Sequence, residues 1–254
     1  SEKPDFAVIS HYHLDHSLWG GLVRSVSDAE LLVPLAEADY VASPEFFLEK
    51  TLGKMPSGEL WKRFVLEHLK FGGCREFSTY DGSFTLDLKK TKMILLPAPG
   101  HSPGHTTAWF PREKILFTSD LGFGPFGPWY GFEDCDICRY VESLLKLKSM
   151  KPRLLLTAHD GVISRDIEGV FGRAMEVFFL REDRIRRALE TGRSRDSMVE
   201  EGIYFQNKEK VKDPFKAFLF DWDGTMFNLH LKVLNQGGLE SFFPGTRPKP
   251  RHRP

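Results

Sequence analysis

The sequence has few cysteines, no long apolar run and no excess of charge of either sign. Its 254 residues include three cysteines, and 35 Lys and Arg balance 35 Asp and Glu. Three cysteines are too few for a disulfide framework and fit a reducing compartment, so we expect a cytoplasmic protein. We find no apolar run long enough for a membrane span and no charged-then-apolar leader typical of a signal peptide. The balanced charge argues against nonspecific binding to nucleic acid or to an anionic membrane.

The pattern of apolar residues divides the chain into two parts. The strand-like runs are 6–10, 30–34, 75–80, 83–88, 92–97, 106–110, 114–119 and 154–158, and the helix-like stretches are 16–26, 44–70 and 135–149. This alternation predicts an α/β fold in which two packed sheets are flanked by helices. Beyond Asp166 the pattern becomes helical, with a long segment that ends near Gly192, which predicts a second and smaller domain.

The sequence HYHLDH, from His11 to His16, contains four metal-binding side chains within six positions. The apolar, β-branched run 6–10 before it places the cluster where a buried strand ends in a loop. Side chains two positions apart in an extended segment point the same way, so His11 and His13 can converge on one ion while Asp15 and His16 turn toward a second. A lone histidine is more often structural, but this density favours a metal site. Imidazole with carboxylate suits zinc, and also iron or manganese.

Three later apolar runs also lead to histidine or aspartate. The run 93–96 is followed by the turn PAPGHSPGHTT, which contains His101 and His105. The run 115–119 is followed by Asp120, and the run 154–158 by His159. Four predicted strands therefore each present a metal-competent side chain at or just beyond the carboxyl end, which chance rarely arranges.

This order of motifs, HxHxDH, GHSPGH, a strand ending in Ser-Asp and a strand ending in His, resembles the metallo-β-lactamase superfamily of metal-dependent hydrolases. The resemblance covers residues 5 to about 165 and implies an αββα sandwich. It implies one ion held by His11, His13 and His101, a second held by Asp15, His16 and His159, and Asp120 as the bridge between them. His101 is preferred to His105 because the family motif uses the His that directly follows Pro-Gly, which leaves His105 a supporting role.

The implied chemistry is hydrolysis by a hydroxide that bridges two divalent metal ions, with zinc favoured over iron or manganese. Asp15 and Asp120 would be the catalytic carboxylates, because Asp15 is placed to orient the hydroxide and to take part in proton transfer. The substrate would be a small molecule with an ester, thioester, lactone, amide or phosphodiester bond. Tyr12, Trp129 and Tyr130 are candidates for groups on the substrate side, although packing explains such aromatic residues at least as well.

Three alternatives stay open from the sequence. A glyoxalase-II-like thioesterase is one, but the cationic residues that would bind glutathione have no match here. An RNA-processing or nucleic-acid-binding metallo-nuclease is another, and the absence of a broad basic surface weakens it. A structural metal protein is the third. A structural zinc ion usually has four protein ligands and no open position, whereas the residues here form a complete ligand set for two ions, which argues against this alternative.

We expect a catalytic domain over residues 1–168, a helical or winged-helix-like domain over 169–245, and a basic Pro-rich tail over 246–254. The spacing within 169–245 resembles the C-terminal cap of the β-lactamase-like-protein-2 subgroup, whose members include RNA-cutting enzymes and uncharacterised hydrolases, so it does not define the substrate. Stretch 44–73 is predicted to be either a lid over the metals or a packing helix.

Two short motifs compete with this interpretation. The CDIC motif, Cys135 to Cys138, has no second CxxC, so we expect a structural role, with Asp134 as the cap of an amphipathic helix that buries one or both sulfurs. The sequence DWDGT, from Asp221 to Thr225, resembles the nucleophile loop of haloacid-dehalogenase-type phosphatases. Only 29 residues follow it, too few for the rest of such a domain, so we predict that it belongs to a helix.

The start of the chain carries a further expectation. Ten residues precede HYHLDH, whereas the resemblance implies several strands there. The sequence also opens without Met, so we expect a partial sequence that lacks the first hairpins. Their loss would leave an unpaired sheet edge and lower the stability.

Overall fold

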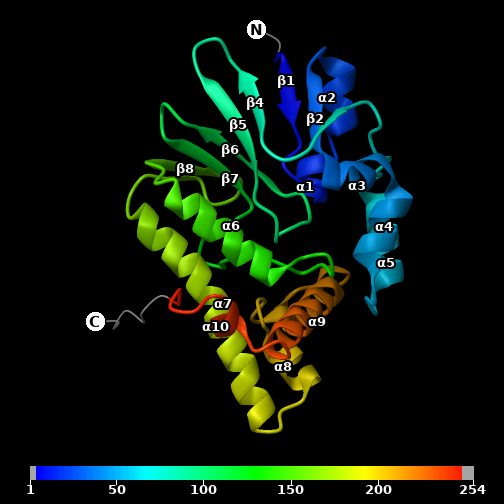
Figure 1. Ribbon diagram of the computed structural model, residues 1–254. Helices are drawn as coiled ribbons and strands as arrows, with labels where there is room; N and C mark the ends of the chain where they lie inside the picture. The colour runs from blue at the N-terminus through cyan, green and yellow to red at the C-terminus, as the bar shows by residue number, and fades with distance from the viewer. Residues whose placement is uncertain (1–3, 248–254) are drawn as a thin grey trace.

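The computed structural model describes residues 4–247, and the two sheets pack face to face with helices on both outer sides (Figure 1). The predicted arrangement of two sheets flanked by helices is therefore confirmed. Almost all of the predicted basic tail lies outside the described residues. No helix among the described residues is both long and apolar enough to cross a membrane.

The first sheet is parallel and has the order β1-β2-β3, formed by Phe6–Val8, Glu30–Pro34 and Ser78–Tyr80. On this side of the molecule α2 (Gly20–Val26) contacts β2. After β2 the chain continues through η1 (Leu35–Glu37), α3 (Ala38–Ala42), α4 (Pro44–Leu52), α5 (Gly58–Arg63) and the π-helical turn η2 (Phe64–His68). Within the described residues β1 pairs only with β2, so it is an edge strand.

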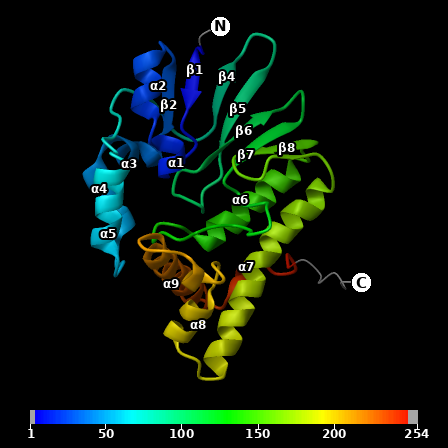
Figure 2. The same ribbon diagram turned by 180° about the vertical axis from the view of Figure 1, so that it is seen from behind.

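The second sheet has the order β4-β5-β6-β7-β8-β9 and is antiparallel except where β7 pairs with β8. Its strands are Phe84–Asp87, Lys92–Pro97, Thr106–Phe110, Ile115–Ser119, Leu154–Thr157 and Val162–Ile163. The crossover between β7 and β8 contains α6 (Ile137–Ser149), which lies with α7 (Ile167–Glu190) on the outer face (Figure 2). The two-residue strand β9 was not predicted.

Two apolar clusters hold the layers together. In β2, Leu32 faces the core between the sheets, where it joins Leu95 of β5, whereas its neighbours Leu31 and Val33 belong to the larger cluster under the helices. This alternation is the period of two expected of a strand that is covered on both faces. Burying each such side chain stabilises the fold by roughly 1.5–3 kcal/mol.

The C-terminal region is helical, as predicted. After α7, the helices are α8 (Arg195–Glu201), η3 (Lys208–Lys210), α9 (Phe215–Leu234) and α10 (Leu239–Phe242). Every regular element described after Ile163 is a helix, so no wing strand accompanies the expected winged helix within residues 164–247. Asp221 and Asp223 lie inside α9, which places DWDGT in a helix and not in a nucleophile loop at the end of a strand.

Two local predictions need correction. The helix-like stretch 44–70 is broken into α4, α5 and η2, because Gly53 adopts a positive φ of 45° at the end of α4 and Pro56 follows it. The cap of α6 is Asp136, whose side chain accepts from the Arg139 N–H at 3.0 Å, and not Asp134. Cys135 is buried and Cys138 is half-buried, and neither forms a disulfide.

Candidate metal centre

The HYHLDH motif leaves the end of β1 and turns directly into a helix. The Ile9 N–H donates to Leu32 O at 2.9 Å, which continues the sheet by one residue before the motif begins. His13 then precedes the short helix α1 (Leu14–Ser17), whose last residue donates its hydroxyl to the Tyr12 carbonyl at 2.7 Å. The turn separates the motif's side chains, so its first two histidines face one position and the next two ligand-type residues face another.

His11, His13 and His101 form a buried group that we call the histidine cluster, with one ring nitrogen from each lying within 4.8 Å of the others. The Nε2 of His101 lies 3.2 Å from Nε2 of His11 and 2.9 Å from Nδ1 of His13. The opposite nitrogen of His101, Nδ1, donates to the Trp129 carbonyl at 2.9 Å, so Nε2 directs a lone pair into the cluster.

A metal ion fits the histidine cluster better than protons do. Burial, followed by the neighbouring imidazoles, lowers the pKa of His11 well below its usual value, and burial likewise lowers the pKa of His13 and of His101. Three neutral rings therefore converge, and a neutral imidazole is the form that binds a metal ion. Tetrahedral ligand nitrogens about 2.0 Å from zinc are roughly 3.3 Å apart, close to the separations observed here.

Asp15, His16, Asp120 and His159 form a second group, the carboxylate cluster, whose ligand atoms also lie within 4.8 Å of one another. Nε2 of His159 lies 3.2 Å from Oδ2 of Asp15 and 3.2 Å from Oδ2 of Asp120. Nε2 of His16 lies 3.1 Å from Oδ1 of Asp120. Burial opposes a charge on His16, but hydrogen bonds to Asp120 and Asp15 raise its pKa to about 9. The two carboxylates thus favour a positive charge here, which a divalent ion also supplies.

Asp120 lies between the two clusters. It follows β7 directly, where Ser119 has a positive φ of 48° that turns the chain out of the strand. Its Oδ2 is 3.9 Å from Nε2 of His11 and 3.8 Å from Nε2 of His101, while Oδ1 faces His16. Burial alone raises the pKa of this carboxyl, but the hydrogen bond from His16 and the nearby imidazoles bring it below its usual value. The side chain is therefore an anion in contact with both clusters.

His105 is close to the centre but both of its nitrogens are occupied by the backbone. Its Nδ1 donates to the Ala98 carbonyl at 3.1 Å, and its Nε2 accepts from the Asp120 N–H at 3.2 Å. Burial lowers its pKa to about 3, so the ring is neutral. The structure thus brings His101, and not His105, into the histidine cluster.

Two residues at the centre were missed from the sequence. Ser10 lies under both clusters: its Oγ is 3.1 Å from Nδ1 of His11 and 3.4 Å from Nδ1 of His16. Glu37 is buried and accepts from the Tyr12 N–H at 2.9 Å, from the Ser102 hydroxyl at 2.7 Å and from a backbone N–H of the same turn as Ser102. It therefore ties the HYHLDH loop to the GHSPGH loop, and burial raises its pKa to about 7. A lone glutamate in a short helical turn carries no sequence signal for this role.

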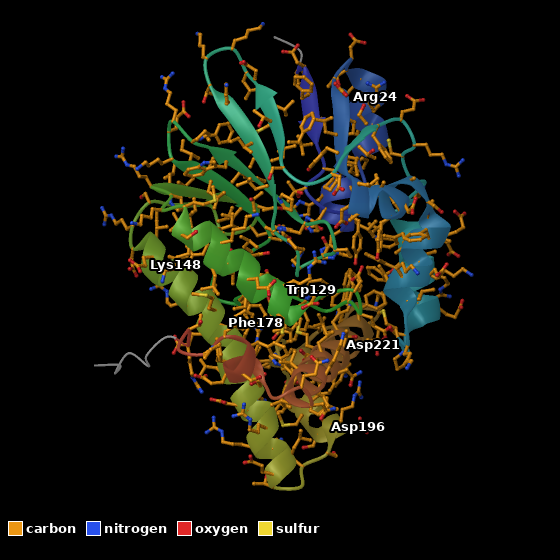
Figure 3. The ribbon with its side chains drawn as sticks, in the orientation of Figure 1. Arg24, Trp129, Lys148, Phe178, Asp196 and Asp221 are labelled. Carbon is orange, nitrogen blue, oxygen red and sulfur yellow. The ribbon has the colours of Figure 1, made fainter. Side chains whose placement is uncertain are left out.

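The three aromatic candidates separate into two kinds. Tyr12 is fully buried, stacks on Tyr40 at 4.1 Å between ring centroids, and donates to Asp134 at 3.0 Å. Tyr130 is also fully buried, and its hydroxyl oxygen lies 2.8 Å from Nε2 of His230. Both are packing residues. Trp129 alone lies at a cavity, in the centre of the molecule in Figure 3.

Two cavities open beside the centre. The larger, which we call the aromatic cavity, has a volume of about 550 Å³ and touches His13, Asp15, His101, Asp120 and His159. A smaller one of about 170 Å³ reaches the same centre from the side of β7 and the glycine-rich loop that follows it. The stretch 44–73 contributes to the wall of the aromatic cavity, and so does α9, which the sequence had not connected with the site.

Comparisons with known proteins agree with this architecture. A family model of the metallo-beta-lactamase superfamily matches residues 1–159. The chain is 26% identical over 168 residues to a beta-lactamase-like protein 2 homolog of Caenorhabditis elegans, covering 65% of this chain and 45% of that protein. It is 25% identical over 186 residues to a metallo-beta-lactamase fold-containing protein of Sulfurisphaera tokodaii, covering 65% of this chain and 64% of that protein. The matches thus span less than two thirds of either curated relative.

Solved structures show the same fold. A beta-lactamase domain protein of Burkholderia ambifaria superposes with a TM-score of 0.72 and 17% identity, covering 92% of this chain and 70% of that one. A metallo-beta-lactamase family protein of Thermus thermophilus superposes with a TM-score of 0.64 and 17% identity, covering 91% and 74%. Since the family model covers well over half of the chain, the expected resemblance is confirmed, and the chain belongs to the metallo-beta-lactamase superfamily.

Proposed function

We propose that this protein is a hydrolase that works with two divalent ions, zinc in the first place and iron or manganese as alternatives. The ligands would be His11, His13 and His101 for one ion, Asp15, His16 and His159 for the other, and Asp120 for both. One observation carries the proposal: two adjoining clusters of metal-competent side chains share the carboxylate of Asp120 and open into a cavity.

Two ions in such a centre lower the pKa of a water molecule toward neutrality and polarise the bond to be cut. The side chains around the ligands hold them in position. The hydrogen bond from Nδ1 of His101 to the Trp129 carbonyl selects the tautomer with a free Nε2. The bond from the Asp120 N–H to His105 holds the backbone of the shared carboxylate.

Asp15 is the candidate for proton transfer. Its side chain lines the aromatic cavity and is 57% exposed, whereas the carboxylate of Asp120 is 12% exposed. Burial raises the pKa of Asp15, but the hydrogen bond with His16 brings it below the usual value, so the group is an anion near neutral pH. Its Oδ2 can therefore accept a hydrogen bond from a water molecule, orient it toward the substrate and take up its proton.

The test is elemental analysis of the full chain combined with a substrate panel. We expect up to two equivalents of metal, and hydrolysis of at least one ester, thioester, lactone, amide or phosphodiester that stops on exhaustive chelation and returns when zinc is added. Metal-free protein after incubation with zinc, iron and manganese, or hydrolysis that survives chelation, would overturn the proposal.

A further inference from the structure

The aromatic cavity has an apolar wall without a cationic side chain. Its ionisable lining residues are Asp15, Asp120, His13, His101 and His159. The other lining residues are all Leu, Phe or Trp. Four of the five tryptophans of the chain lie there, namely Trp19, Trp61, Trp129 and Trp222. Small-molecule sites commonly have volumes of about 300–1,000 Å³, so a cavity of this size suits a small molecule with a large apolar part.

The wall is assembled from two distant parts of the chain. Trp61 of α5 lies 5.9 Å from Trp222 of α9 between ring centroids, and Phe64 lies 5.2 Å from Phe215. Asp221, the first residue of DWDGT, accepts hydrogen bonds from the backbone N–H and the hydroxyl of Ser57, next to α5. Figure 1 shows α5 and α9 approaching each other below the sheets. The helical region thus completes the cavity instead of standing apart from it.

Apart from the two ions proposed for the centre, the walls of the two cavities offer no cation to an anionic substrate. A phosphodiester backbone is normally held by Lys and Arg, but neither lines the aromatic cavity or the smaller cavity on the other side. Arg63 lies instead in an adjoining groove, together with the acidic residues Glu67 and Asp213. Apolar recognition next to the reacting bond is therefore better supported than backbone recognition of RNA.

We propose, resting on the two-ion hydrolase function above, that the substrate is a carboxylic ester or thioester whose apolar acyl chain fills the aromatic cavity. Its carbonyl then lies at the metal centre and its leaving group toward the smaller cavity, which contains Gly122, Gly124 and Asp160. Water adds to the acyl carbon and the C–O or C–S bond breaks. The products are the carboxylic acid and the alcohol or thiol, whose oxygen or sulfur receives a proton from the water.

The first test is the dependence of kcat/KM on acyl length. The zinc-loaded full chain is assayed with p-nitrophenyl acetate, butyrate, hexanoate and octanoate, and with bis(p-nitrophenyl) phosphate as the anionic comparison. Each methylene transferred from water into an apolar cavity is worth about a fourfold change, so we expect a rise of at least about 100-fold from acetate to octanoate. We expect the phosphodiester to be the poorest substrate.

Variants connect this dependence to the cavity. Trp222→Ala should reduce the octanoate-to-acetate ratio at least about tenfold, because it removes part of the wall. Phe215→Lys should reduce the ratio as well, and its position is tolerant since Phe215 is 47% exposed. Val26→Ala is the matched control, because Val26 is 68% exposed on α2 and is not part of the cavity lining. An unchanged ratio in both cavity variants would overturn the assignment.

Binding to the metal-free protein separates this inference from the proposed function. Tryptophan fluorescence is titrated with the N-methyl amides of acetic, hexanoic and decanoic acid. We expect the decanoic amide to bind at least about 100-fold tighter than the acetic amide. Steep binding without hydrolysis of any substrate would support the cavity assignment while refuting the hydrolase. Metal-dependent hydrolysis with a flat acyl profile, or a preference for the phosphodiester, would keep the hydrolase and overturn the acyl substrate.

Discussion

The two clusters of the candidate metal centre present similar metal-competent atoms in opposite surroundings. In the histidine cluster the side chains of His11 and His101 are 0% and 2% exposed, whereas in the carboxylate cluster Asp15 and His159 are 57% and 56% exposed. The first is neutral and buried; the second carries two carboxylates and faces the cavities. We therefore expect the histidine cluster to hold its ion tightly, and the carboxylate cluster to exchange its ion more readily and to face the substrate.

The largest expected effect comes from removing the residue that the clusters share. Asp120→Ala should lower kcat/KM by at least about 1,000-fold and the metal content by more than one equivalent, because its carboxylate lies beside His16 and His159 of one cluster and beside His11 and His101 of the other. Steady-state kinetics and elemental analysis measure this, with circular dichroism to check the fold. Asp196→Ala, at a carboxylate that is 91% exposed on α8, is the control. Two retained ions and normal turnover would contradict the shared role.

The difference between the clusters can be sharpened by removing one ligand from each. We expect zinc to bind with two affinities, measured in competition with a chelator. His159→Ala should weaken the lower-affinity binding, and His13→Ala the higher-affinity binding, each by more than about 100-fold. The reason is that His13 is buried in a neutral site and His159 is half-exposed in an acidic one. If both variants weakened the same one of the two zinc affinities, the two clusters would not bind separate ions.

Glu37, behind the histidine cluster, should make stability depend on pH. Its folded pKa of about 7 lies above its usual 4.5, so the folded state holds the proton more tightly than the unfolded chain does. Its contribution to the free energy of unfolding is complete below pH 4.5 and falls by about 3 kcal/mol as pH rises to 7. Denaturant unfolding from pH 4.5 to 8 should show a weaker decline in Glu37→Gln than in the unmodified chain. Parallel profiles would refute this.

A smaller effect is expected at His105, which supports the centre without joining a cluster. His105→Ala should lower kcat/KM by about 10-fold to 100-fold through the loss of its contact with the Asp120 backbone, and should leave the metal content unchanged. His101→Ala is the comparison and should lose an ion. The reverse order of the two variants would show that the wrong histidine had been chosen.

The smallest effect is expected at the aspartate of DWDGT. Asp221→Asn keeps an acceptor for Ser57, so we expect turnover within about twofold and a loss of at most about 1 kcal/mol in the free energy of unfolding. Enzyme assays and denaturant unfolding measure both. A phosphatase activity that disappears in Asp221→Asn but persists in Asp120→Ala would restore the nucleophile-loop interpretation.

The strands were predictable because their signal is local. The predicted runs 92–97 and 106–110 coincide with β5 and β6, since alternating or continuous apolar residues between turn signals define buried strands. The stretch 44–70 was predicted as continuous although Gly53 and Pro56 signalled breaks within it. The proposed domain boundaries and the expectation of missing strands before β1 stay predictions.

The sequence by itself determined the metal-competent residue types and their places, because histidine and aspartate at strand ends are recognisable from neighbours only a few residues away. The convergence of His11 with His101, 90 positions later, required the two sheets to pack. Only tertiary structure decided that Glu37 joins two loops and that Trp222 faces the same cavity as Trp61. Such contacts depend on how whole layers and helices pack, and no local pattern of residues records that packing.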